Sequence, residues 1–207
     1  MLRGAQGGIR TGEEGGTAAI LTILFTDITG STALTERLGD DRWVQVLSAH
    51  DAVVRFVLAC HGGREVKTVG DGFMAVFDRA PAAVWAGVEI QRLMRTVRVP
   101  EVAGGLQLRV GVHTGPVICR DGDVLGRTVH VARRITSAAG SGEVLVSAPV
   151  KALSGRRGAL AGPPRTLSFK GVADPQVVFD MSAASGSGAE GAEGATVHVL
   201  AERRVVR

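Results

Sequence analysis

The stretch Val69-Gly-Asp-Gly-Phe73 separates two short runs of β-favouring residues, 65–69 and 73–77. Glycine tolerates the backbone conformations that a tight turn requires, and one glycine lies on each side of Asp71. Two such runs joined by so short a linker predict an antiparallel hairpin. The predicted hairpin makes this part of the chain part of a sheet, and it places Asp71 at the tip of a turn.

Apolar runs and helical periodicities alternate along the rest of the chain. We expect further strands over residues 19–26, 106–113, 116–119, 143–147, 166–169 and 176–181, with a break between the second and third at Gly115. We expect helices over residues 31–38, from Asp40 or Asp41 to the Gly62-Gly63 pair, from Pro81 onward, and over 129–139 and 149–153. This order predicts an α+β sandwich with a mostly antiparallel sheet and helices on one face.

Glycine divides the chain into three parts. Residues 1–17 and 183–207 are rich in glycine and poor in apolar side chains, so they are expected to be flexible tails. Residues 18–182 hold the apolar runs and form one predicted domain.

The net charge is +4, from 24 Lys and Arg against 20 Asp and Glu. This positive excess suits an anionic ligand. The basic residues are not clustered into the stripe typical of a nucleic-acid-binding protein, so no nucleic-acid partner is expected. The sequence shows no signal peptide and no apolar run long enough for a bilayer, which predicts a cytoplasmic protein without a membrane partner. The two cysteines form neither a disulfide framework nor a zinc pattern.

Two aspartates stand where predicted strands end. Asp27 follows the strand over 19–26 and precedes Gly30-Ser31-Thr32, which opens a helix whose free N–H groups can face phosphate oxygens. A carboxylate so close would repel that phosphate unless a cation lay between them. Asp27 and Asp71 on adjacent strands could hold Mg²⁺, which prefers one or two carboxylates plus substrate phosphates. The alternative is that Asp71 serves only the geometry of its turn.

Four motifs in order carry a family resemblance: FTDITGST (25–32), VKTVGDGFMAVF (66–77), LRVGVHTGPV (108–117) and GDVLGRTVHVARRI (122–135). They resemble the catalytic domain of the class III nucleotide cyclases, particularly the bacterial adenylate cyclases. GEVLVS (142–147) and LSFKGVADPQVVF (167–179) are similar to that family's C-terminal strands. The resemblance spans residues 19–181 and implies the ferredoxin-like α/β sandwich of this family, a homodimer, and active sites shared between the two subunits.

The resemblance also implies a metal site. Asp27 and Asp71 match the family's metal-binding aspartates, and the backbone carbonyl of Ile28 matches a further ligand. Two Mg²⁺ or Mn²⁺ ions per active site are implied. The triphosphate would lie against the Gly30–Thr32 segment.

Other matches concern the nucleotide. Lys67 matches the family's adenine-selecting lysine and Asp123 its partner carboxylate; an ammonium donates to adenine N1, and a carboxylate accepts from the 6-amino group. The pair therefore favours ATP over GTP. Arg134 matches the arginine that stabilises charge on the α-phosphate in the transition state, and Lys170 matches a lysine that contacts the β- and γ-phosphates. The implied activity is that of an adenylate cyclase, which forms 3′,5′-cyclic AMP and pyrophosphate.

The chain departs from the family pattern on one predicted helix. His130 stands where the family usually has an asparagine that orients the ribose, one turn before Arg134. A histidine is larger and can become charged. His130 therefore leaves open a second hypothesis, a degenerate module that dimerises and binds nucleotide with little turnover. Arg133 replaces a small residue and is expected to be solvated, while the charge of Arg120 makes it a candidate phosphate contact.

Overall fold

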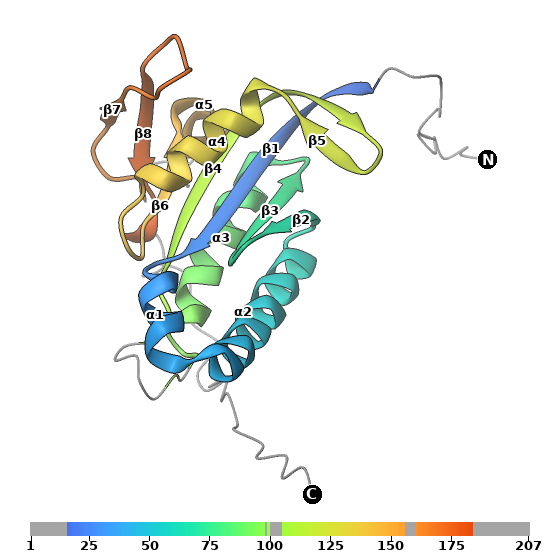
Figure 1. Cartoon of the computed structure of the whole chain (residues 1–207). Coiled ribbons are helices and arrows are strands. Elements are labelled where there is room, and N and C mark those ends of the chain that lie inside the picture. Colours follow the sequence, from blue (N-terminus) through green and yellow to red (C-terminus); the bar gives the residue numbers. More distant parts are fainter. Residues whose placement is uncertain (1–15, 98, 100–104, 156–159, 184–207) are drawn as a thin grey trace, which may run out of the picture.

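The computed structural model describes residues 16–97, 99, 105–155 and 160–183 (Figure 1). The predicted tails lie outside these residues except for 16, 17 and 183. The strands are β1 (Thr17–Ile28), β2 (Arg64–Val69), β3 (Gly72–Phe77), β4 (Leu108–Arg120), β5 (Asp123–Leu125), β6 (Val144–Ser147), β7 (Arg165–Leu167) and β8 (Gln176–Asp180). The helices are α1 (Ser31–Leu38), α2 (Asp40–Cys60), α3 (Ala80–Met94), α4 (Arg127–Ala138) and α5 (Ala148–Leu153).

All eight described strands form one sheet. Their order is β2-β3-β1-β4-β6-β8-β7, and β5 pairs with β4 beside this path. Among these pairs only β4 and β6 are parallel, so the prediction of a mostly antiparallel α+β fold is confirmed. The long central strands β1 and β4 pair along their whole length, from Thr17 opposite Cys119 to Ile28 opposite Leu108.

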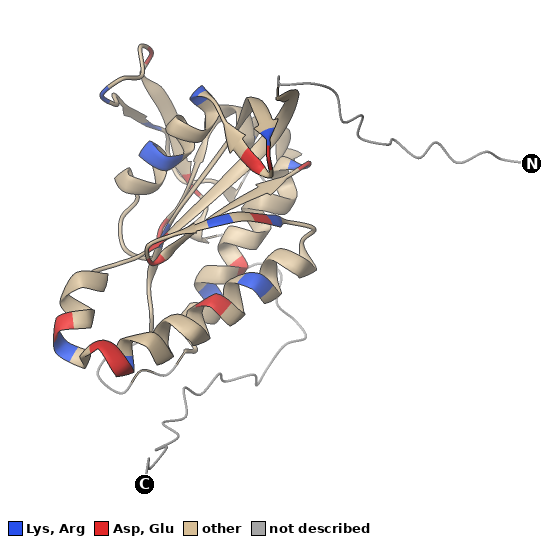
Figure 2. Cartoon of the chain, turned by 45° about the vertical axis from the view of Figure 1, so that its right-hand side comes forward, with Lys and Arg blue, Asp and Glu red and all other residues tan. Residues whose placement is uncertain are grey.

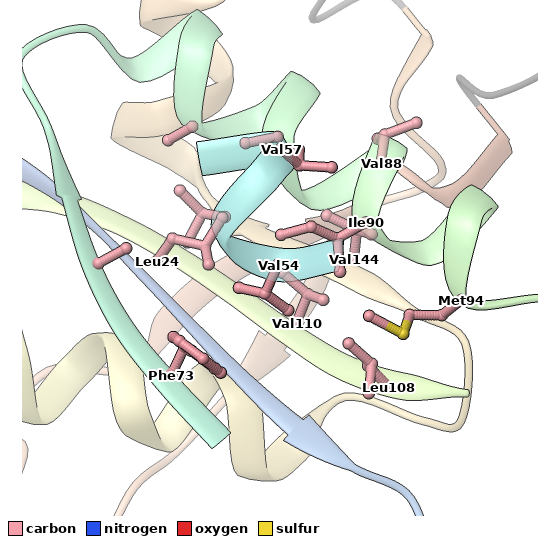
Figure 3. Close-up of a cluster of buried hydrophobic side chains, with 14 of the residues drawn as sticks. Leu24, Val54, Val57, Phe73, Val88, Ile90, Met94, Leu108, Val110 and Val144 are labelled. Atoms are coloured by element: carbon pink, nitrogen blue, oxygen red, sulfur yellow. The ribbon is translucent and has the colours of Figure 1, made fainter. Parts of the chain in front are cut away.

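The main apolar core lies between one face of the sheet and helices α2, α3 and α5 (Figure 3). Leu24 of β1 and Val110 of β4 point into it, together with Val54 of α2 and Ile90 of α3. Burial of such side chains contributes about 1.5–3 kcal/mol each. This core packs against β1, which carries Asp27, and against β3, which begins directly after Asp71.

Helix α4 lies on the opposite face of the sheet, in front of β4 in Figure 1. Ala132 of α4 packs there against Ile23 and Phe25, which alternate along β1 with the residues of the main core. The expectation of helices on one face therefore holds for α2, α3 and α5 but not for α4. Alternation of side chains cannot tell which helix covers which face when both faces are apolar.

The predicted break at Gly115 is wrong, because β4 continues through it as a single strand. A Cβ at residue 115 would lie 2.7 Å from the Oγ1 of Thr128, whose hydroxyl donates to the Pro116 carbonyl at 2.6 Å. Gly115 thus allows the start of α4 to approach β4 closely. Strand β5 was not predicted, since three residues give no periodicity.

Acidic and basic residues are interspersed along the described elements (Figure 2). Helix α2 is long and apolar enough to cross a bilayer by length and composition. Core helices of soluble domains pass the same test, and α2 packs Val46, Val54 and Val57 into the main core.

Candidate active site

Asp27 and Asp71 lie beside each other because β1 and β3 pack very closely at this end. Strand pairing continues to Phe25 opposite Met74, which brings Asp27 level with Gly72. A Cβ at residue 72 would lie 2.1 Å from the Thr26 carbonyl oxygen and 3.5 Å from the Asp27 Cα. Glycine at residue 72 is thus a requirement of the backbone contact, and the contact brings the neighbouring Asp71 to the end of β1.

A second contact locks the same strands together. The backbone N–H of Phe73 donates to the buried hydroxyl of Thr26 at 3.0 Å. As predicted, β2 and β3 form a hairpin, and Asp71 lies in its turn between Val69 and Gly72. The carboxylates are therefore attached to two strands that contact each other through backbone and side chain.

The environment of Asp71 fits a cation. Its Oδ2 atom is buried and has no hydrogen-bond partner among the described residues. A buried carboxylate oxygen without a partner is costly, and a hard cation is a suitable ligand for it. The described residues contain no group of three or more His, Cys, Asp or Glu side chains around a metal position. Two carboxylates and a carbonyl, such as that of Ile28 at the end of β1, match Mg²⁺ or Mn²⁺ that also binds a phosphorylated ligand.

Arg109 is the partner of Asp27 that sequence reasoning missed. It lies directly opposite Asp27 in the β1–β4 pair, and its Nη2 forms a hydrogen-bonded ion pair with the Asp27 carboxylate. The Asp27 carboxylate is thus oriented by a cation of the chain itself. Only the register of β1 against β4 identifies Arg109 as the partner of Asp27, and a single sequence does not reveal that register.

Helix α1 begins beside Asp27. Gly30 adopts a left-handed conformation and its carbonyl accepts the first helical hydrogen bond, from Leu34 N–H at 3.0 Å. No side chain caps this end of α1, so the N–H groups of Ser31 and Thr32 have no helical partner. The predicted start of a helix after Gly30 is therefore present, close to Asp27 in the chain.

Lys67 and Asp123 meet as predicted. The Lys67 Nζ donates to both Asp123 carboxylate oxygens, at 2.6 and 2.8 Å. This bond, with a second from the Val124 N–H, lowers the pKa of Asp123. Both side chains are partly exposed, so their polar atoms remain accessible to a ligand.

A β-bulge in β2 aims Lys67 at Asp123. Glu65 lies opposite Ala75, but Lys67 lies opposite Met74, so Val66 is an extra residue in this strand. The shift moves Lys67 to the α4 face of the sheet, whereas Glu65 pairs with Arg55 of α2 on the other face. Without the bulge, Lys67 would share the face of Glu65.

His130 and Arg134 are exposed on α4, one turn apart on the same stripe of the helix. Neither lines the pocket at Asp27. Lys170 is exposed in the turn after β7. Arg120 lies at the other end of β4 from Arg109, opposite Asp123, and does not join the carboxylates either.

A pocket of about 50 Å³ opens beside Asp27. It is lined by Phe25, Thr26, Asp27, Val69, Gly72, Arg133, Thr136 and Ser137. Pockets for small ligands usually measure roughly 300–1,000 Å³. This pocket alone is therefore smaller than a nucleotide-sized site.

His113 of β4, in the LRVGVHTGPV motif, has a side-chain partner within the fold. Its Nδ1 lies 2.8 Å from the Ser147 hydroxyl, and burial lowers the pKa of His113 to about 4. The imidazole is neutral at pH 7 and belongs to the packing of β4.

Residues 16–172 match the family model of the adenylate and guanylate cyclase catalytic domain. A protein of Mycobacterium tuberculosis is 35% identical over 170 residues, which cover 81% of this chain and 43% of that protein. An adenylate cyclase of Streptomyces coelicolor is 36% identical over 127 residues, which cover 61% of this chain and 32% of that protein. The crystal structure of the guanylyl cyclase Cya2 superposes with a TM-score of 0.72 at 30% identity, covering 81% of this chain and 93% of that one. The chain thus spans less than half the length of these two curated relatives.

Proposed function

The chain belongs to the adenylate and guanylate cyclase catalytic domain family, and on that basis we propose that it is an adenylate cyclase. In the proposed reaction the 3′-hydroxyl oxygen of ATP attacks the α-phosphorus and loses its proton to solvent. The bond from the α-phosphorus to the oxygen bridging to the β-phosphate breaks and releases pyrophosphate. The other product is 3′,5′-cyclic AMP.

The ion pair of Lys67 with Asp123 is the observation that carries the choice of ATP. Lys67 supplies a donor for adenine N1, and Asp123 supplies an acceptor for the 6-amino group. Guanine presents an N–H and a carbonyl at the same positions, so it would set donor against donor and acceptor against acceptor. Each such mismatch leaves a polar group unpaired, which strongly lowers kcat/KM for the nucleotide with the wrong base.

Asp27, Asp71 and the Ile28 carbonyl would hold the divalent ions that this family generally uses. Two Mg²⁺ or Mn²⁺ ions there would acidify the attacking hydroxyl and neutralise the leaving pyrophosphate. The unpaired Asp71 oxygen supports this assignment. Arg109 keeps the Asp27 carboxylate oriented while no ion is bound.

The phosphates are positioned by the chain's own donors. The free N–H groups of Ser31 and Thr32 at the start of α1, after Gly30, bind triphosphate oxygens. Arg134 stabilises charge on the α-phosphate, Lys170 binds the outer phosphates, and His130 orients the ribose. Since no side chain is needed as nucleophile, positioning and charge account for the catalysis.

We further propose a homodimer that shares its active sites. The small pocket at Asp27 and its separation from Arg134 support this, because a partner can supply what one chain lacks. Exposed apolar side chains gather where β1, β4 and β5 extend beyond the helices: Ile20 is 76%, Ile118 48% and Leu125 38% exposed. Ile118 lies opposite Leu125, which makes the apolar surface continuous. A second copy would cover this surface.

The test is the formation of cyclic AMP and cyclic GMP by the full chain, with ATP or GTP and with Mg²⁺ or Mn²⁺. We expect cyclic AMP, and we expect Lys67→Ala to lower the ATP-to-GTP ratio of kcat/KM about ten-fold or more. Glu65→Gln is the matched control, because it removes a carboxylate of the same strand that pairs with Arg55 on the opposite face. Its ratio should equal that of the wild type.

A degenerate nucleotide-binding module is the second candidate, and the exposed His130 in place of asparagine favours it. Nucleotide binding without any cyclic product, at every metal and protein concentration, would establish that candidate. A preference for GTP would instead contradict the role of Lys67 and Asp123.

A further inference from the structure

Arg133 has different surroundings from its neighbour Arg134. Its guanidinium carbon lies 5.7 Å from the centre of the Phe25 ring, on the face of the sheet that α4 covers. Arg133 also lines the pocket at Asp27, together with Ser137 one turn further along α4. Successive residues on a helix point about 100° apart, which is why Arg134 faces elsewhere. The expectation that Arg133 is simply solvated is therefore incomplete.

The Phe25 ring brings this guanidinium close to the carboxylates. Phe25 and Asp27 lie two residues apart on the same face of β1, a separation of about 7 Å. In the part of the chain that the structure describes, no carboxylate forms an ion pair with Arg133, whereas Asp27 pairs with Arg109. Contact with an aromatic face limits the freedom of the guanidinium while leaving its N–H groups available. A fixed, unpaired cation at the rim of a pocket is suited to an anion.

We infer that Arg133 binds the polyphosphate of the nucleotide held by Asp27 and Asp71 of the same chain. The inference rests on the proposed function, because it takes this pocket as the place of the triphosphate. A guanidinium offers two parallel N–H donors to phosphate oxygens, which makes it a strong phosphate ligand. Arg133 then acts on the nucleotide in cis with Asp27, whereas Arg134 acts in trans from the partner chain.

Binding can be measured without turnover. The probe is 3′-deoxy-ATP with Mn²⁺, which lacks the attacking hydroxyl, and its Kd is measured by calorimetry on the full chain. We expect Arg133→Ala to raise this Kd, and the KM for ATP, about ten-fold, with kcat changed less. Arg133→Met keeps the stem over Phe25 but not the charge and should behave as Arg133→Ala does. Arg133→Lys keeps the charge but not the two parallel donors, so its Kd should lie between those of the wild type and of Arg133→Ala.

The control is Arg127→Ala. Arg127 is another exposed arginine of α4, and it pairs with Asp174. Its removal should leave both Kd and KM unchanged. If Arg133 only packs on Phe25, Arg133→Met would bind nucleotide as the wild type does, and the inference would be wrong.

Mixed dimers decide between cis and trans action. In the first mixture, one chain carries Asp27→Ala and Arg133→Ala, and the other chain carries Arg134→Ala. The only complete site of the mixed dimer then has Asp27 and an intact Arg133 on the same chain. In the reciprocal mixture, Arg133→Ala is moved to the chain that carries Arg134→Ala. We expect a wild-type KM in the first mixture and a KM raised about ten-fold in the second. The reverse result would overturn the assignment to the same chain.

Failure of this inference and failure of the proposed function give different results. If the wild-type chain neither binds 3′-deoxy-ATP nor forms a cyclic nucleotide, both fail together. If it binds the probe and Arg133→Ala binds it equally well, the inference alone is wrong and the proposed function stands.

Discussion

The carboxylate end of the sheet and the outer surface of α4 are built in opposite ways. Asp27 and Asp71 are attached to strands that touch through Gly72, and one carboxylate oxygen is buried without a partner. His130 and Arg134 stand exposed on a helix. The difference is that Asp27 and Asp71 are positioned by contacts within the chain, whereas His130 and Arg134 are exposed on its surface, where the proposed partner chain would meet them.

The largest effect is expected from one substitution at the carboxylate end and one on α4, each made in a separate variant. Asp27→Ala and Arg134→Ala should each lower cyclase activity about 10³-fold, because the first removes a proposed metal ligand and the second removes charge that stabilises the transition state. An equimolar mixture of the two variants should recover about a quarter of the wild-type activity, since half of the dimers are mixed and each has one complete site. Cyclic AMP formation after subunit exchange measures the recovery.

The control for this experiment is a mixture of Asp27→Ala with Asp71→Ala. Both substitutions fall in the same region, so no mixed dimer contains a complete site. Recovery in this control, or its absence in the first mixture when exchange is proven by labelled chains, would show that the two regions do not act across a subunit interface.

A second prediction tests the rigidity of the carboxylate end. Gly72→Ala places a Cβ against the Thr26 carbonyl and should force β3 away from β1. We expect a loss of about 2–3 kcal/mol in the free energy of unfolding and about 100-fold in activity. Denaturant titration and the cyclase assay measure the two losses.

Gly70→Ala is the matched comparison within the same turn. Gly70 has a φ of 66°, but open space surrounds the position of its Cβ. Only the backbone strain remains, which costs about 1–2 kcal/mol, so activity should be largely kept. Equal losses of activity in both variants would mean that the turn, rather than the contact with Thr26, positions Asp71.

The preorganised end was the more predictable of the two regions. The Gly-Asp-Gly turn is a local signal, and the sequence alone predicted the hairpin, the position of Asp71 in its turn and the start of α1 after Gly30. Each depends on backbone preferences of a few neighbouring residues.

The remaining features depend on long-range register and could not be predicted in this way. Arg109 opposite Asp27 requires the pairing of strands that lie far apart in the chain. The bulge at Val66 shifts Lys67 to the other face, and alternation of side chains in β2 gives no sign of it. The packing of α4 on the second face of the sheet depends on Gly115, which the sequence suggested as a break.

A third, smaller prediction concerns His113, which stabilises the sheet between the two regions. Burial lowers the pKa of His113 to about 4, against 6.5 for an exposed histidine. Below pH 6.5 the unfolded chain binds a proton that the folded chain does not, so the free energy of unfolding falls between pH 6.5 and 4. The loss reaches about 3 kcal/mol near pH 4 and disappears above pH 6.5.

His113→Asn isolates this contribution, because every other ionisable group is the same in both proteins. The difference in unfolding free energy between the two proteins should shrink as the pH falls from 6.5 to 4. A difference that stays constant over this range would show that His113 is protonated in the folded chain.

The smallest expected effect concerns the α4 surface. His130→Asn places the smaller amide, with its donor and acceptor on one group, where the family usually holds the ribose, and we expect kcat to rise about three-fold, or about 0.7 kcal/mol in the barrier. His61→Asn, a histidine that pairs with Glu89 far from α4 in the sequence, is the control and should leave kcat unchanged. Because His130 is exposed, the melting temperature should not change. If kcat falls instead, the histidine is the better fit for this chain's substrate, and the exposed surface of α4 is then as specifically built as the carboxylate end.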